Sequence, residues 1–165
     1  MTIHNLYIFD RHCHCISFTS WTRPAPPKQD GQADTAQQSM QSTGATGMSL
    51  EEEAKLVYGV VFSLRNLVSK LAAKPGSDGF ISYRTSTYKL HYFETPSGLK
   101  FVMNTDPHAD SMREALRTIY AQIYVEYVTK NPLMHQLASS GVHPVQNDLF
   151  RGNLQRYVRT LPGFE

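Results

Sequence analysis

The chain of 165 residues has only two cysteines, Cys13 and Cys15. These two lie too close together on an extended segment to form an ordinary structural disulfide, which favours a reducing compartment. The sequence also lacks a basic N-terminal leader and any stretch of about 18 consecutive apolar residues. No run of five or more like charges occurs among the 16 Lys and Arg and 14 Asp and Glu. These absences predict a soluble, cytoplasmic protein with no nucleic-acid partner.

The common catalytic motifs are missing as well, since there is no phosphate-binding glycine pattern and no nucleophile elbow. Two tracts nevertheless contain residue types that ligate metals. In His12 to Cys15 (HCHC), neighbouring side chains on a strand point to opposite faces, so at most two can converge. Asp106, His108 and Asp110 precede a predicted helix, where carboxylates commonly cap free N–H groups. We therefore predict no catalytic residue, no metal site and no cofactor, with a metal-dependent enzyme at either tract as the alternative.

Residues 22 to 48 contain no Val, Ile, Leu, Phe, Tyr or Trp and are rich in Pro, Gln, Ser, Thr, Ala and Gly. Such a segment cannot bury enough apolar area to offset the entropy lost on ordering. We expect it to be a disordered insertion in a single domain that spans residues 1–165. It is either a regulatory linker or a tolerated expansion of a surface loop.

Hydrophobic periodicity and turn residues predict five strands: Ile3 to Phe9, Cys15 to Trp21, Gly79 to Thr85, Thr87 to Thr95, and Leu99 to Thr105. Three helices are predicted: from a capping box at Ser49 and Glu52 to about Ala73, from a second capping box at Ser111 and Glu114 to Asn131, and from Val145 to Leu161. The order ββαβββαα predicts an α+β fold. Its simplest arrangement is a five-stranded antiparallel sheet with one helix on one face and two on the other.

The first predicted helix has apolar residues on more than one side. One stripe is expected to pack on the sheet: Leu56, Val57, Val60, Val61, Leu64, Leu67, Val68 and Leu71. Tyr58 and Phe62, with Arg65 and Ser69 beside them, lie on the opposite side, where a half-buried helix would be polar. Aromatic residues beyond the needs of one core occur at Tyr58, Phe62, Tyr92, Phe93 and Tyr124. A sheet covered on both faces would bury them, and otherwise they predict a protein interaction surface.

Six blocks of the chain match one family in the same order: His4 to Arg11 (HNLYIFDR), Lys55 to Lys70 (KLVYGVVFSLRNLVSK), Tyr88 to Gly98 (YKLHYFETPSG), Met103 to Asp106 (MNTD), Tyr124 to Leu133 (YVEYVTKNPL) and Tyr157 to Pro162 (YVRTLP). Together they resemble the subunit 1 family of the trafficking protein particle (TRAPP), which has the longin, or sedlin-like, fold. The chain departs from the family pattern at two places. One is the insertion at 22–48. The other is the hairpin turn, where His12 and Cys13 occupy positions at which related sequences tend to have glycine.

The resemblance implies a non-catalytic core subunit of a vesicle-tethering complex that acts as guanine-nucleotide exchange factor for a Rab GTPase in endoplasmic reticulum to Golgi transport. It implies pairing with a second longin-type subunit, contacts with other TRAPP core subunits, and peripheral association with endoplasmic reticulum and Golgi membranes through the complex. The contact residues we predict are Tyr58, Phe62, Arg65 and Ser69. The alternative is another longin-type interaction module, such as an adaptor small chain.

Overall fold

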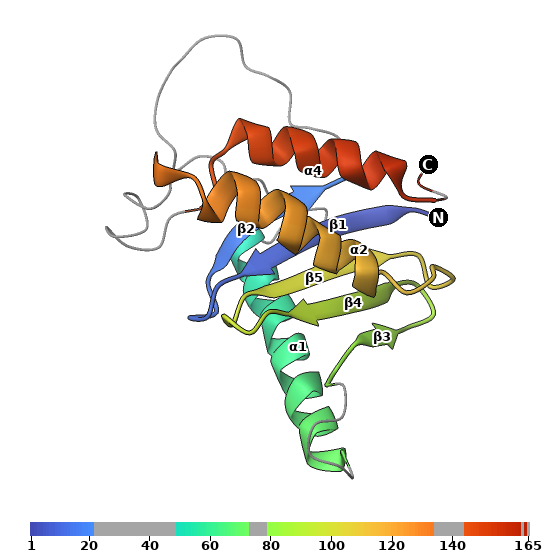
Figure 1. Ribbon diagram of the computed structural model, residues 1–165. Coiled ribbons are helices and arrows are strands. Elements are labelled where there is room, and N and C mark those ends of the chain that lie inside the picture. The colour runs from blue at the N-terminus through green and yellow to red at the C-terminus, as the bar shows by residue number, and fades with distance from the viewer. Residues whose placement is uncertain (22–48, 73–78, 134–143, 163, 165) are drawn as a thin grey trace. The chain divides into compact units, whose positions relative to one another are not determined.

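The computed structural model describes residues 1–21, 49–72, 79–133, 144–162 and 164 (Figure 1). The chain divides into two compact units, one of Met1–Thr22 with Ile81–Glu165 and the other of Arg23–Phe80. The predicted insertion at 22–48 lies outside the described residues. The prediction that the whole chain forms one domain stays a prediction.

The first unit is built on a five-stranded antiparallel sheet with the strand order β2-β1-β5-β4-β3. Its strands are β1 (Ile3–Phe9), β2 (Cys15–Ser20), β3 (Ser82–Arg84), β4 (Lys89–Glu94) and β5 (Lys100–Thr105). The predicted number of strands is confirmed, and the predicted bounds of β1 are those observed. The two sheet edges are formed by β2 and by β3, whose three residues are all exposed.

The helices follow in the predicted order, which confirms the α+β, longin-like succession ββαβββαα. Helix α1 (Leu50–Leu71) belongs to the second unit, and its predicted position on one face of the sheet stays a prediction. In the first unit, α2 (Arg113–Thr118) continues into the π-helix η2 (Ile119–Thr129), and α4 (Asp148–Thr160) follows. The predicted second capping box is wrong, because α2 begins after Met112 and has no side-chain cap. Asn147 caps α4 by accepting hydrogen bonds from the Leu149 and Phe150 N–H groups.

The core of the first unit lies between the sheet and the helices α2, η2 and α4. Large side chains of β1 and β5 face those helices: Ile3, Leu6, Ile8, Phe101 and Met103. The helices contribute buried residues that include Leu116, Ile119, Ile123, Tyr124, Phe150, Leu154 and Val158. Leu149 of α4 lies outside this core, because its side chain is 64% exposed.

The π-helix changes which aromatic residues are buried. Tyr127 is only partly buried, whereas Tyr124 and Val128 are buried. A π-helix has more residues in each turn than an α-helix, and the buried residues Ile119, Ile123, Tyr124 and Val128 follow that wider spacing. Tyr124 therefore packs edge-to-face against Phe101 of β5 and Phe150 of α4.

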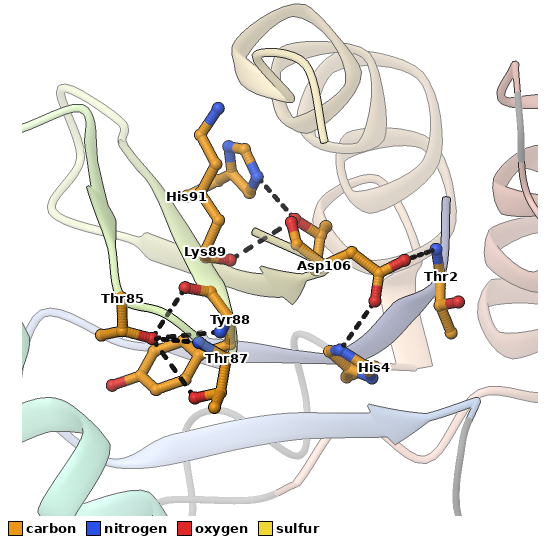
Figure 2. Close-up of polar contacts among 9 residues, drawn as sticks. Thr2, His4, Thr85, Thr87, Tyr88, Lys89, His91 and Asp106 are labelled. Carbon is orange, nitrogen blue, oxygen red and sulfur yellow. Dashed lines mark hydrogen bonds and ion pairs between the residues drawn. The ribbon is translucent and has the colours of Figure 1, made fainter. Parts of the chain in front are cut away.

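His91 of β4 contacts β5, as Figure 2 shows, and it also contacts the start of α2. Its Nδ1 accepts a hydrogen bond from the Met112 N–H at 3.4 Å, so the neutral ring carries its proton on Nε2, which lies 2.9 Å from Thr105 Oγ1. The ring is 2% exposed. Burial, followed by the positive charge of Lys89, lowers the pKa of His91 to about 4. His91 is therefore a buried packing and hydrogen-bonding residue of the sheet.

Asp106 ties the end of β5 to the start of the chain rather than to the following helix. Its Oδ2 accepts a hydrogen bond from the Thr2 N–H, and its Oδ1 lies 3.4 Å from His4 Nε2 (Figure 2). The Thr2 hydrogen bond is the main cause that lowers the pKa of Asp106. The expected helix-capping role of Asp106 is therefore wrong.

The turn between β1 and β2 contains a strained residue. Asp10 Oδ1 accepts hydrogen bonds from the backbone N–H groups of His12 at 2.8 Å and His14 at 2.9 Å. Cys13 has a φ of 74°, in the left-handed region that favours glycine. This geometry explains why glycine suits this turn.

Protonation of His91 is expected to destabilise the fold in acid. Its folded pKa of about 4 lies below the ordinary 6.5, so its neutral form is favoured on folding and this stability is lost as pH falls from 6.5 to 4. The loss is about 3 kcal/mol. Chemical unfolding between pH 7 and 4 should show a steeper loss for the natural chain than for His91→Gln. If the stability of the two chains falls equally with pH, the lowered pKa of His91 is contradicted.

Replacing Cys13 tests the strain in the turn. We expect Cys13→Val to lower the free energy of unfolding by about 1–2 kcal/mol, because a β-branched side chain is disfavoured at positive φ. Cys13→Gly should leave it unchanged or raise it. His12→Val is the matched control, because His12 is an exposed neighbour without a positive φ. Thermal unfolding measures all three, and equal effects of the two valine variants would refute the strain.

Candidate interaction surface

Helix α1 starts where the sequence predicts, because its first turn is closed by side chains. Glu52 N–H donates to Ser49 Oγ at 3.3 Å, and Ser49 N–H donates to Glu52 Oε2 at 2.9 Å. The backbone hydrogen bond from Ser49 is the main cause that lowers the pKa of Glu52. The reciprocal capping box therefore fixes the start of the helix and the direction in which each later side chain points.

An apolar stripe of α1 is exposed. Leu56, Val60, Leu67 and Leu71 have exposed fractions between 45% and 73%. We call these four residues the α1 stripe. The four residues recur on one face of the helix, and Ser63 lies on that face between Val60 and Leu67. The prediction that all eight residues of the apolar stripe are core residues is wrong for these four.

The burial of α1 is centred on a different face from the one predicted. Ala54 and Val61 are buried, and Val57, Leu64 and Val68 are half-buried. At about 100° per residue, the apolar positions of α1 extend around about two-thirds of its circumference. One buried face of an amphipathic helix needs little more than about 100°. The apolar arc of α1 is wider than one buried face needs. This width indicates from the sequence that some of the apolar residues are exposed.

The four predicted contact residues lie on the side of α1 away from the stripe. Tyr58 is half-buried, and its ring stacks on that of Phe62 with centroids 6.1 Å apart. Phe62 is 48% exposed, and Arg65 and Ser69 are exposed. The structure therefore brings the two aromatic residues together and leaves Phe62 accessible.

The other candidate aromatic residues do not add to an exposed surface. Tyr92 and Tyr124 are buried, and Phe93 packs against the core of the first unit. These three residues are therefore not available as an exposed interaction surface. Burial raises the pKa of Tyr124 to about 12, so its hydroxyl stays protonated.

The two tracts with metal-ligand residue types both lie within the described ranges. No group of three or more His, Cys, Asp or Glu side chains is arranged to hold a metal ion in the described ranges. Asp10 and Asp106 accept backbone hydrogen bonds instead, and burial raises the pKa of Cys15 to about 11. A buried thiol with a raised pKa is a poor thiolate donor, which disfavours ligation by Cys15.

Among the helices whose residues are described, none is both long enough and apolar enough to cross a bilayer.

The chain is similar along nearly its whole length to proteins named as subunits of trafficking particles. The model of the Sybindin-like family matches residues 3–161. "Trafficking protein particle complex subunit 1" of Rattus norvegicus is 45% identical over 164 residues, which cover 99% of this chain and 97% of that protein. "Transport protein particle subunit bet5" of Schizosaccharomyces pombe is 39% identical over 166 residues, which cover 99% of this chain and 100% of that protein.

A more distant relative is "Trafficking protein particle complex subunit 4" of Bos taurus, which is 36% identical over 107 residues, 64% of this chain and 46% of that protein. The family model spans nearly the whole chain, and the relatives named above as subunit 1 and bet5 align with it along almost their full lengths. The chain belongs to the Sybindin-like family.

Proposed function

We propose that this chain is a non-catalytic core subunit of the TRAPP vesicle-tethering complex. The observation that carries the proposal is the similarity to proteins named as subunit 1 of that particle, at 39–45% identity over 97–100% of their lengths. The chain takes the place of subunit 1 in the assembly.

Within that complex, the chain helps to form the guanine-nucleotide exchange platform for a Rab GTPase in endoplasmic reticulum to Golgi transport. Exchange requires no covalent chemistry from the platform. A surface that binds the nucleotide-free GTPase more tightly than the nucleotide-bound form favours release by that difference in affinity. A subunit without an active site of its own is therefore sufficient, and it works in the cytoplasm at the surface of endoplasmic reticulum and Golgi membranes.

The α1 stripe is the proposed contact with a second longin-type subunit. Single exposed aliphatic side chains are ordinary, but four on one helix face form an apolar surface that favours a protein partner. At the edge of this surface Lys55 pairs with Glu51 at 2.7 Å. Exposed pairs of this kind contribute little to affinity, so the aliphatic side chains supply most of the binding energy. The similarity to a protein named as subunit 4 supports a partner related to this chain.

Phe62, Arg65 and Ser69, with Tyr58 stacked behind Phe62, form a second proposed contact on α1. Phe62 and Leu67 point in directions about 140° apart around the helix axis. One flat partner surface cannot cover both. We therefore assign the aromatic side of α1 to a different partner from the one on the stripe, either a neighbouring core subunit or the GTPase.

Affinity purification of the tagged chain tests the assignment to TRAPP. We expect small longin and TRAPP-type subunits to co-purify, and the eluate to accelerate nucleotide release from one Rab GTPase and not from unrelated ones. Mass spectrometry and a fluorescent-nucleotide release assay make these measurements. Recovery of large adaptin-like subunits in their place would contradict the proposal and favour an adaptor small chain.

The double variant Leu56→Asp/Leu67→Asp tests the α1 stripe. Burying two carboxylates in an apolar interface should reduce recovery of the partner longin subunit at least about tenfold, which corresponds to about 1.4 kcal/mol or more. Both sites are exposed, so the melting temperature of the isolated chain should change little. Quantitative mass spectrometry of the purified complex measures the recovery.

Leu133→Asp provides the control, because Leu133 is an exposed leucine outside α1. Phe62→Asp separates the two sides of the helix, since it should reduce a different partner and spare the longin subunit. If Leu56→Asp/Leu67→Asp recovers the longin subunit as fully as Leu133→Asp does, the stripe is not the contact.

A further inference from the structure

The turn between β3 and β4 is built around the hydroxyl group of Thr85 (Figure 2). Thr85 Oγ1 donates a hydrogen bond to the Tyr88 carbonyl at 3.0 Å and accepts from the N–H groups of Thr87 at 3.3 Å and Tyr88 at 3.0 Å. The Thr85 N–H closes the turn by donating to the Tyr88 carbonyl at 2.8 Å. Ser86 and Thr87 therefore form the tip of this hairpin, and both are exposed.

The hydroxyl groups of the turn differ in whether they are free to react. Thr85 Oγ1 has one proton, which it donates to Tyr88, so the Thr87 hydroxyl is the donor in its 3.4 Å contact with Thr85 Oγ1. The Ser86 hydroxyl forms no hydrogen bond with any residue that the structure describes. A modifying enzyme can therefore react with Ser86 without breaking a side-chain contact of the turn.

Two cations lie opposite each other next to this tip. Arg84 of β3 is the cross-strand partner of Lys89 of β4, in the pair nearest to the turn. Directly opposed side chains share one face of the sheet, and like charges in such a pair are destabilising. Lys89 Nζ donates to the Ala109 carbonyl at 2.7 Å, and Arg84 is exposed. Neither side chain forms an ion pair with a residue in the described ranges.

Strand β3 is held to the sheet by few contacts. It contains three residues, all exposed, and it forms one edge of the sheet. One of its three cross-strand pairs is the like-charged pair of Arg84 and Lys89. Exposed segments with few contacts open locally more readily than central strands. The hairpin is thus accessible to an enzyme, and one of its pairs gains stability when negative charge is added beside it.

We propose that Ser86 is a phosphorylation site and that phosphate at this position fastens β3 to β4. A protein kinase transfers the γ-phosphoryl group of ATP to Ser86 Oγ. The new P–O bond forms at Oγ, the bond to the β-phosphate oxygen breaks, ADP leaves, and the serine proton passes to a base of the kinase. Arg84 stands two residues before Ser86, and charges close to the target residue are what kinases use to select substrates.

The phosphate turns the repulsion between Arg84 and Lys89 into attraction of both to a common anion. It has a charge of about −1.5 to −2 at neutral pH and three strong acceptor oxygens. A guanidinium group binds such oxygens through paired hydrogen bonds, and an ammonium group binds them as a point charge. A phosphoserine near two cations therefore orders the segment that contains it. This effect on the edge strand does not depend on which partners bind α1.

Mass spectrometry of the chain, purified within its complex from cells treated with phosphatase inhibitors, tests whether the site is used. An endoprotease that cleaves after acidic residues releases residues 79–94, which contain the whole turn. We expect a phosphate on Ser86 that phosphatase removes. Recovery of this peptide only without phosphate, or with phosphate on Thr85 or Thr87 in place of Ser86, would overturn the proposal.

Phosphoserine installed at position 86 during translation tests the effect on β3. Hydrogen exchange of the Thr85 N–H, which is bonded to Tyr88 in the closed turn, measures how often the hairpin opens. We expect phosphoserine to slow this exchange at least about threefold in the natural chain at low salt. In Arg84→Gln the slowing should be much smaller, because one of the two cations is missing.

Arg151→Gln is the matched control, because Arg151 is an exposed arginine of α4 and the substitution removes the same charge. Phosphoserine at position 86 should slow the exchange in this variant as much as in the natural chain. Comparing the two variants cancels any direct effect of the phosphate on the exchange chemistry of its neighbour. An equal effect of phosphoserine in Arg84→Gln and Arg151→Gln refutes the contact between the phosphate and Arg84.

The Ser86 site and the assignment to TRAPP fail separately. An unphosphorylated Ser86 in a complex that retains all TRAPP-type subunits rejects only the modification site. Recovery of adaptins rejects the proposed function, while phosphate on Ser86 and its effect on the Thr85 N–H are still measured on the chain itself.

Discussion

The packing of aromatic rings around Phe101 holds the first unit together. Phe101 is fully buried on the central strand β5, and its ring centroid lies 5.8 Å from that of Tyr124 in η2. Tyr124 in turn packs against Phe150 of α4 at 6.2 Å. A shift of β5 by one residue would turn Phe101 to the other face of the sheet. The positions of η2 and α4, and the His91 contact with the start of α2, therefore depend on the register of this strand.

The two surfaces that we propose as contacts use different physical interactions. The α1 stripe gains affinity by removing aliphatic side chains from water, which depends little on salt. The aromatic side of α1 presents the exposed ring of Phe62 stacked on Tyr58, so ring packing contributes there. Neither interaction needs a cofactor or a reactive side chain.

The candidate surface on α1 was only partly predictable from the sequence. The periodicity correctly identified an apolar helix with an accessible aromatic residue, Phe62. It did not separate the buried Val61 from the exposed Leu67, because both lie in one continuous apolar arc. Hydrophobicity measures only the preference of a side chain for burial. Whether another surface is present to cover that side chain depends on parts of the fold that are distant in sequence.

The sequence by itself determined the order of the elements, the bounds of β1 and the start of α1 at Ser49. These features depend on alternation and on a capping contact across three residues, so neighbouring residues contain the whole signal. Only the tertiary structure decided that η2 buries Tyr124, that Leu149 is exposed, and that His91 accepts a hydrogen bond from Met112. Each of these requires a surface or a partner supplied by a distant part of the chain. Local patterns cannot specify such partners, because the free energy of these contacts arises only once the sheet and the helices have come together.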